Sequence, residues 1–265
     1  MFNLFGKLVG APATPVAPAA EAAPSRPDPL GRPTVHLLHI PKTAGTAIKA
    51  ALEGVEGTER FALRLCPHGL RLSHVPAGDK VAFVLRDPVD RFVSGFFSRK
   101  RQGRPRYDSP WSEGERAAFA RFETPEALAR GLLSADRALR REAREAMRRI
   151  NHVRTSYWDW FGDESALEAR LGDVVFVARQ ERLGAEFPRF RATLGLPETL
   201  DLPRDEVRAH RNGYADDAKL SLESVEALRD WYARDYTFLR FCETRLGLEP
   251  WNGATDWQRR LAAAG

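Results

Sequence analysis

Three short apolar runs, each followed by a segment with helical spacing, constrain the fold of this chain most strongly. The runs are TVHLLHI at 34–40, KVAFVLR at 80–86 and DVVFVAR at 173–179. Each is dense in β-branched and aromatic residues, which is typical of a strand buried on both faces. Strands that alternate with helices predict an α/β fold with a central, mostly parallel sheet.

Helices are predicted after these strands and in a long insertion between the second and the third. The first helix covers 44–52, the second begins at Pro88, and the third ends at Gly195. Within the insertion, residues 136–150 place four apolar side chains on one helical stripe: Leu139, Ala143, Met147 and Ile150. Six arginines cover the other faces, which indicates a solvated amphipathic helix.

Composition excludes several classes of protein. The chain has 265 residues, enough for one large domain or two small ones, and its 43% hydrophobic and 29% charged residues exclude general disorder. No stretch approaches the roughly 20 apolar residues of a membrane span. A net charge of +5 suggests an anionic ligand and is too small for a DNA-packaging protein, so no nucleic-acid partner is expected. Two distant cysteines, Cys66 and Cys242, predict a reducing compartment, the cytoplasm, and no disulfide framework.

The N-terminal segment differs in composition from the rest. Residues 11–33 contain seven Ala and seven Pro, which predicts an extended linker, so we expect a disordered segment at 1–33 and one folded domain at 34–265. Residues 1–10, MFNLFGKLVG, lack the basic start of a signal peptide. They are a candidate for a small docking helix or a peripheral membrane contact.

The first strand runs directly into an anion-binding pattern, His39-Ile40-Pro41-Lys42-Thr43-Ala44-Gly45-Thr46. A strand, a loop with a lysine and a glycine, and then a helix would aim backbone N–H groups and a cation at one anion. This is not a Walker A loop, because its lysine comes before the glycine instead of after it.

The second strand ends in a second pattern, RDPVDRFVSG at 86–95. Arg86 stands at the carboxyl end of its strand, where open α/β sheets bind ligands. Ser94 lies about two helical turns further on, so its hydroxyl can return to the same edge. An arginine with a hydroxyl suits a phosphate group. A structural ion pair between Arg86 and Asp87 would explain the arginine equally well.

Together the two patterns resemble the sulfotransferases that use 3′-phosphoadenosine 5′-phosphosulfate (PAPS). The motif sequences are most similar to those of the carbohydrate branch, which contains the heparan-sulfate 2-O type and bacterial relatives. The resemblance implies a P-loop-like, three-layer fold and PAPS as co-substrate. It implies that Lys42 stabilises the leaving oxygen, that Arg86 and Ser94 bind the 3′-phosphate, and that Arg211 closes over the nucleotide. The residues that would hold the 5′-phosphosulfate are Lys42, Thr43, Ala44, Gly45, Thr46 and Ala47. No metal is expected, since the sequence has no H-E-x-x-H motif, paired carboxylates or cysteine cluster.

The acceptor hydroxyl needs a base. In the carbohydrate branch that this chain resembles, a catalytic histidine comes from a His-Gly element between the two motifs. His68, which precedes Gly69, fits this element better than His74, and an acidic residue is the other alternative. Glu181, after the third strand, is a candidate for substrate contact or for pairing with Arg179.

The sequence thus predicts an enzyme that transfers a sulfuryl group in line from PAPS to a hydroxyl of a sugar or glycan. Lys42 and His68 would be its catalytic residues. One alternative is a P-loop-like nucleotide phosphotransferase, which needs the G-K-[ST] loop that is absent here. Another is a non-catalytic basic module that binds a glycan or RNA, with salt-sensitive affinity and no turnover of a donor.

Overall fold

The structure, a computed structural model, describes residues 28–105, 107–203 and 219–250. Its centre is a four-stranded sheet in the order β2-β1-β3-β4, in which every pair of neighbouring strands is parallel. The strands are β1 (Thr34–Leu37), β2 (Ala62–Leu65), β3 (Lys80–Leu85) and β4 (Val174–Arg179). The predicted α/β class and parallel sheet are confirmed.

One strand, β2, was not expected from the sequence. Its four residues, ALRL, lie at the edge of the sheet and are all only half-buried. They pair with β1 from Thr34↔Ala62 to Leu37↔Leu65. An edge strand this short has neither the continuous apolar run nor the β-branched residues that revealed the other three.

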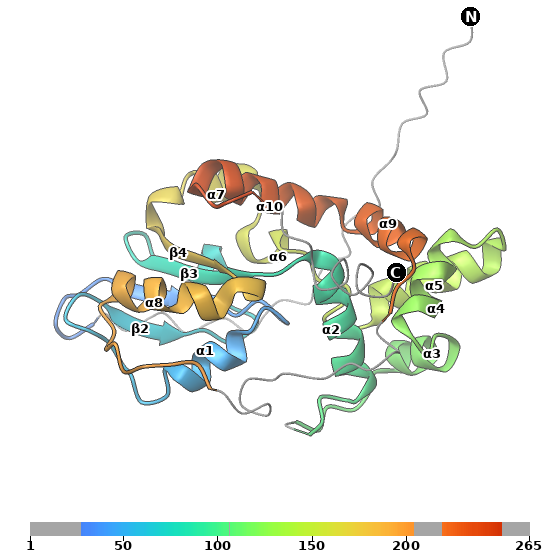
Figure 1. Cartoon of the computed structure of the whole chain (residues 1–265), viewed down its shortest axis with the longest axis horizontal. Helices are drawn as coiled ribbons and strands as arrows, with labels where there is room; N and C mark the ends of the chain where they lie inside the picture. The colour runs from blue at the N-terminus through green and yellow to red at the C-terminus, as the bar shows by residue number, and fades with distance from the viewer. Residues whose placement is uncertain (1–27, 106, 204–218, 251–265) are drawn as a thin grey trace, which may run out of the picture.

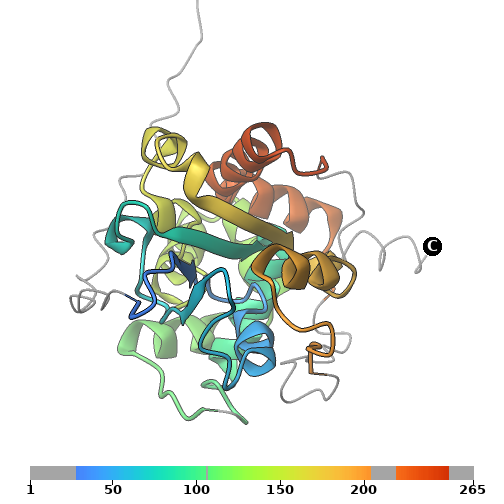
Figure 2. The same cartoon turned by 90° about the vertical axis from the view of Figure 1, so that its left-hand side faces the viewer.

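Helices cover both faces of the sheet, which gives three layers (Figures 1 and 2). On one face, α1 (Gly45–Ala51) and α8 (Leu183–Leu194) pack on alternate strand residues, among them Val35, Val84 and Phe176. On the other face, α6 (Trp158–Phe161) and α10 (Ala233–Leu246) pack on Val81, Phe83 and Val177. The aromatic run YWDWF at 157–161 belongs to this second core.

A helical region extends the molecule beyond the end of β3, as Figure 1 shows. It comprises α2 (Pro88–Lys100), α3 (Glu113–Arg121), α4 (Pro125–Leu133), α5 (Arg137–Arg149) and α9 (Leu222–Trp231). These helices share a third core, in which the predicted stripe of α5 contributes Ala143, Met147 and Ile150. Shorter elements complete the described chain: η1 (Leu72–His74), α7 (Glu164–Glu168), η2 (Leu171–Asp173) and η3 (Gln180–Arg182).

Helix α2 connects this region to the sheet. It begins directly after β3, with Pro88 at its first position and Asp87 as its cap, whose carboxylate accepts from the N–H groups of Val89 at 2.8 Å and Asp90 at 3.3 Å. A proline and an aspartate at these positions fix where a helix starts. The start of α2, and with it Arg86, is therefore set firmly against the end of β3.

None of the helices that the structure describes is long and apolar enough to cross a membrane. Both cysteines are buried and carry free thiols. Burial raises the pKa of the Cys66 thiol to about 12 and also raises that of Cys242, so both stay protonated at neutral pH.

Candidate active site

The two sequence motifs meet at the point where the sheet reverses its order. From β1 the chain leads through α1 to β2 on one side, and from β3 it leads to β4 on the other. Loops that follow adjacent strands in opposite directions leave a crevice at the carboxyl edge, where α/β proteins bind ligands. The segment after β1 contains Lys42 and the segment after β3 contains Arg86, and Arg86 Nη1 donates to the Lys42 carbonyl at 3.3 Å.

The loop between β1 and α1 has an unusual backbone. Lys42 and Ala44 both have φ of 68°, in the left-handed region that side chains other than glycine rarely adopt. Such strain concentrates at functional sites, where successive N–H groups are turned toward an anion. Within the described residues, no acceptor receives the N–H groups of Thr43, Ala44, Gly45 or Thr46.

Two expected contacts of this loop are used internally in the structure. The Thr43 hydroxyl is buried and donates to the carbonyl of Ile40 at 3.0 Å, and the Ala47 N–H donates to the carbonyl of Ala44 at 2.9 Å. The Thr43 hydroxyl and the Ala47 amide therefore shape the loop, while the four amides before Ala47 and the Thr46 hydroxyl make no hydrogen bond within the described chain.

Lys42 is a cation in an unfavourable environment. Burial, together with the positive charges of Arg86 and Arg101, lowers its pKa to about 7. No carboxylate of the described chain pairs with its ammonium group. A lysine of this kind is stabilised by an anionic ligand, which restores the pKa toward its ordinary value.

Arg86 also has unused hydrogen-bonding capacity. Its Nε is buried and has no partner among the described residues, whereas its backbone N–H and carbonyl both bond to the hydroxyl of Tyr157. The suggested ion pair with Asp87 does not account for this arginine, because the Asp87 carboxylate caps α2 and accepts from Tyr236. Ser94 is buried within α2.

Glu181 plays a part that the sequence did not indicate. One of its oxygens accepts from the backbone N–H of Asp87 at 2.8 Å, and the other is buried without a partner in the described chain. Burial raises the pKa of this carboxyl, and Arg86 opposes the shift. Arg179 instead pairs with Glu243 at 3.4 Å. Glu181 thus helps to fix the turn between β3 and α2.

Three histidines lie beside the loop of Lys42. The His68 ring stacks on that of His39, with centroids 3.8 Å apart, and lies 6.2 Å from that of His152. His68 is exposed, while His39 is buried. The Nδ1 atoms of His39 and His152 are buried and without partners among the described residues. His74, the alternative base, is exposed, and its Nδ1 accepts from the N–H of Arg71 at 3.1 Å.

Burial, not a neighbouring carboxylate, controls how these histidines titrate. It lowers the pKa of His39 to about 2 and that of His152 to about 3. Partial desolvation, on the side where its ring stacks on His39, lowers the pKa of His68 as well, although this residue is exposed at the surface, and the charges of Lys49 and Lys42 add to the effect. All three imidazoles are therefore neutral at pH 7, and the exposed one is free to accept a proton.

Sequence reasoning did not assign His39 or His152 to the site. Each of these histidines packs closely against a glycine of one motif. A Cβ on Gly45 would lie 2.3 Å from Cδ2 of His39, and one on Gly95 would lie 3.2 Å from Cβ of His152. His152 itself has φ of 65°. The sequence signal was present in the glycines of both motifs, but their partners can be read only from the fold.

The remaining expectations have simple outcomes. Arg211 and residues 1–10 lie outside the described residues. Within the described parts of the chain, no group of three or more His, Cys, Asp or Glu side chains is arranged to hold a metal ion.

Comparison with known proteins identifies the family. The model of the sulfotransferase family matches residues 31–242, which is most of the chain. No curated protein matches this chain. Among solved structures, mouse sulfotransferase SULT7A1 complexed with PAP is similar at 13% sequence identity and a TM-score of 0.35, over 88% of this chain and 89% of that chain. The match to the family model includes both motifs and the whole sheet. The chain belongs to the sulfotransferase family and is an enzyme of sulfuryl transfer.

Proposed function

We propose that this enzyme moves the sulfuryl group of PAPS to a hydroxyl of a carbohydrate or glycan acceptor. The observation that carries the proposal is the contact between the two motifs, Arg86 Nη1 on the Lys42 carbonyl at 3.3 Å. It brings the Arg86 guanidinium to the backbone of Lys42 at the carboxyl edge of the sheet, and the charge of Arg86 acts on the Lys42 ammonium by lowering its pKa. A nucleotide with a 5′-phosphosulfate and a 3′-phosphate would use one cation for each group.

The donor would be held mainly by the backbone of the loop. The amides of Thr43, Ala44, Gly45 and Thr46, together with the Thr46 hydroxyl, would bind the phosphosulfate, and Ala47 would support them through its bond to Ala44. Arg86 would offer its partnerless Nε to the 3′-phosphate, and the hydroxyl of Ser94, on α2, is proposed as the second contact. Arg211 is proposed as a further contact on the sequence pattern alone.

The proposed reaction needs two opposite protonation states. The acceptor oxygen attacks sulfur, its proton passes to the neutral imidazole of His68, and the bond between sulfur and the bridging oxygen breaks. Lys42 must be charged to stabilise the oxygen that leaves. The lowered pKa of His68 favours the first requirement, and the negative charge of the donor would raise the pKa of Lys42 to meet the second.

The exposure of His68 favours a large, polar acceptor. A base at the surface can serve one hydroxyl of an oligosaccharide without enclosing the whole molecule, whereas a small apolar alcohol gains its binding from a closed pocket. The buried free thiols suit a cytoplasmic enzyme. Residues 1–10 are proposed as a peripheral membrane contact, with no nucleic acid among the partners.

A transfer assay with labelled PAPS tests the proposal. The purified protein is incubated with oligosaccharides, lipids and small alcohols, and the product is analysed for label. We expect label on an oligosaccharide, and we expect 3′,5′-ADP to raise the Tm more than 5′-AMP does. Label only on lipids or small alcohols would overturn the acceptor class. Equal stabilisation by the two nucleotides would overturn the assignment of the 3′-phosphate site.

A further inference from the structure

The backbone of Arg86 is held by one side chain from a distant part of the chain. The Tyr157 hydroxyl accepts from the Arg86 N–H at 2.9 Å and donates to the Arg86 carbonyl at 2.5 Å. Tyr157 is completely buried, and its ring stacks on Phe238 with centroids 5.3 Å apart. Burial raises the pKa of this phenol, so it keeps the proton that it donates.

This contact lies where the sheet can no longer hold the chain. The ladder between β3 and β4 ends at the pair Leu85↔Arg179, one residue before Arg86. The phenol of Tyr157 therefore supplies the donor and the acceptor that a neighbouring strand would otherwise provide. On the other side of Arg86, the bond from the Asp87 N–H to Glu181 fixes the next peptide.

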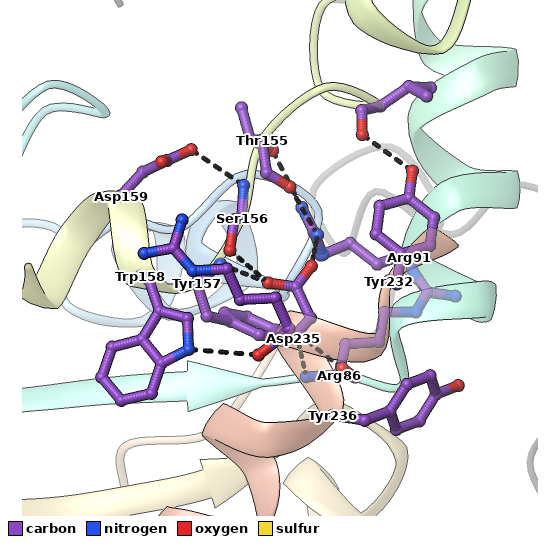
Figure 3. Close-up of polar contacts among 12 residues, drawn as sticks. Arg86, Arg91, Thr155, Ser156, Tyr157, Trp158, Asp159, Tyr232, Asp235 and Tyr236 are labelled. Carbon is purple, nitrogen blue, oxygen red and sulfur yellow. Dashed lines mark hydrogen bonds and ion pairs between the residues drawn. The ribbon is translucent and has the colours of Figure 1, made fainter. Parts of the chain in front are cut away.

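Tyr157 is in turn held by a buried ion pair, as Figure 3 shows. Arg91 Nη2, on α2, lies 2.7 Å from Asp235 Oδ2, on α10, and each side chain is about 1% exposed. The other oxygen of Asp235 accepts from the Tyr157 N–H at 2.7 Å and from the Ser156 hydroxyl at 2.6 Å. Arg91 also donates to the hydroxyl and the carbonyl of Thr155, at 2.8 and 2.7 Å. All three residues of 155–157 are thus tied to one pair of charges.

The core alone would not need this arrangement. A phenylalanine at 157 would fill the same space and stack on Phe238 equally well, without a hydroxyl to satisfy. The hydroxyl is directed at the backbone of Arg86, an arginine whose buried Nε has no partner among the described residues. A guanidinium binds a phosphate well only when its fork is fixed in direction, and that direction depends on the backbone from which it extends.

We propose that Tyr157, fixed by the Arg91–Asp235 pair, is the residue that positions Arg86 and thereby sets the preference for nucleotides with a 3′-phosphate. This inference rests on the proposed role of Arg86. It assigns a role in donor specificity to a segment more than 60 residues from either motif.

The experiment compares Tyr157→Phe with a matched control, Tyr232→Phe. Tyr232 is also buried in the core and lies under the same Arg91, with 5.7 Å from the guanidinium carbon to the ring centroid. Its hydroxyl, however, donates to the carbonyl of Val153 at 2.7 Å and does not touch Arg86. Each variant loses one buried hydroxyl, so we expect similar falls in Tm for both.

The measurement is the ratio of the Kd of 5′-AMP to the Kd of 3′,5′-ADP, obtained by calorimetry. We expect Tyr157→Phe to reduce this ratio about tenfold, as the loss of one charge-assisted contact would. Tyr232→Phe should leave it within about twofold. An unchanged ratio in Tyr157→Phe, or an equal reduction in Tyr232→Phe, would overturn the inference.

Arg86→Ala separates this inference from the function on which it rests. If Arg86→Ala leaves the ratio unchanged, the proposed 3′-phosphate site is wrong, whatever Tyr157 does. If Arg86→Ala lowers the ratio, Tyr157→Phe should have no further effect in that background, because both changes remove one interaction. Additive effects of the two changes would contradict the positioning role.

A milder variant covers the case in which Tyr157→Phe does not fold. Ser156→Ala removes only one hydrogen bond from Asp235 and leaves Tyr157 intact. We expect a smaller fall of the nucleotide ratio in the same direction. If Tyr157→Phe is unfolded and Ser156→Ala keeps the ratio of the unmodified protein, the inference is overturned.

Discussion

Lys42 shows how one residue of the site depends on its ligand. The protein half-buries this lysine, places Arg86 and Arg101 nearby, and gives it no carboxylate partner among the described residues. Its pKa near 7 means that the free enzyme loses much of this charge slightly above neutral pH. A bound donor would reverse this effect by adding negative charge, so we expect binding to be linked to proton uptake.

This linkage can be measured with 3′,5′-ADP. At pH 8, calorimetry in buffers of different ionisation enthalpy should show an uptake approaching one proton per bound nucleotide. At pH 6, where Lys42 is already protonated, its contribution should vanish. Lys42→Met should abolish the contribution of Lys42 to the uptake at pH 8. The proton exchange that this variant still shows is the contribution of the nucleotide itself. Equal uptake by both proteins would show that Lys42 is charged in the free enzyme.

His68 provides a second test at the scale of one residue. Partial desolvation and the charges of two lysines lower its pKa from 6.5, so the neutral, basic form persists to lower pH than for a free histidine. We therefore expect kcat/KM to be level just below neutral pH and to fall as the pH drops through the lowered pKa. His68→Ala should lose about 10²–10⁴-fold in kcat and should lack this acid limb.

His74→Ala is the matched control for His68→Ala. It removes an exposed histidine from the same segment, and it should retain most of the activity with the acid limb unchanged. An acid limb above pH 6.5, or a loss of activity as large in His74→Ala as in His68→Ala, would contradict the assignment of the base.

At the scale of an element, the start of α1 is limited by space. A Cβ on Gly45 would meet Cδ2 of His39 at 2.3 Å and Nε2 at 2.6 Å, so the buried ring would have to move. Overpacking of this kind typically costs 1–3 kcal/mol. We expect Gly45→Ala to lower the free energy of unfolding by about 1–2 kcal/mol and to reduce kcat, because His39 stacks on His68.

Gly184→Ala is the matched control, because it makes the same change at a position where the added methyl group meets no other side chain. Gly184 lies in α8, and a Cβ there would meet nothing within 4 Å. Since alanine is the better helix former, urea unfolding should show a gain of up to about 1 kcal/mol, with activity unchanged. Similar behaviour of the two variants would mean that His39 adapts to the extra methyl group.

The elements also show what a sequence can and cannot predict. Strands β1, β3 and β4 were found because strands buried on both faces have a continuous apolar composition. Helix α2 was found because Pro88 marks its start. The edge strand β2 was missed because four half-buried residues at an edge carry little of this signal. Local patterns therefore predicted the centre of the sheet and not its border.

The site follows the same rule. Lys42, Gly45 and Arg86 belong to contiguous patterns whose chemistry can be read from the sequence. His39 and His152 are 113 positions apart, and only the fold brings both of them to His68. The sequence shows Tyr157 only as part of an aromatic run, YWDWF, and gives no sign of the bonds between its hydroxyl and the backbone of Arg86. A pattern can name the groups that touch a ligand, whereas the groups that hold them in place depend on tertiary structure.

At the scale of the whole molecule, the start of the folded body can be tested. The Asp28 carboxylate accepts from the N–H groups of Leu30 and Arg32, at 3.1 and 3.0 Å, and pairs with the Arg32 guanidinium at 2.8 Å. Arg32 Nη1 donates to the Thr58 carbonyl at 2.5 Å, and the Thr58 hydroxyl donates to the carbonyl of Leu194, at the end of α8. Residues 28–32 are thus connected through Thr58 to the helical layer on one face of the sheet.

Two truncations and one point variant test whether the boundary lies before or after these residues. Removal of residues 1–27 should leave Tm and sulfuryl transfer unchanged. Removal of residues 1–33, the boundary that composition predicts, should lower Tm by a few degrees because the anchor on Thr58 is lost. Arg32→Ala in the full chain should reproduce most of that shift, since it removes the same anchor. A Tm that is equal for the two truncated proteins would place the boundary at residue 34, and a fall already on removal of 1–27 would show that the first segment contributes to the fold.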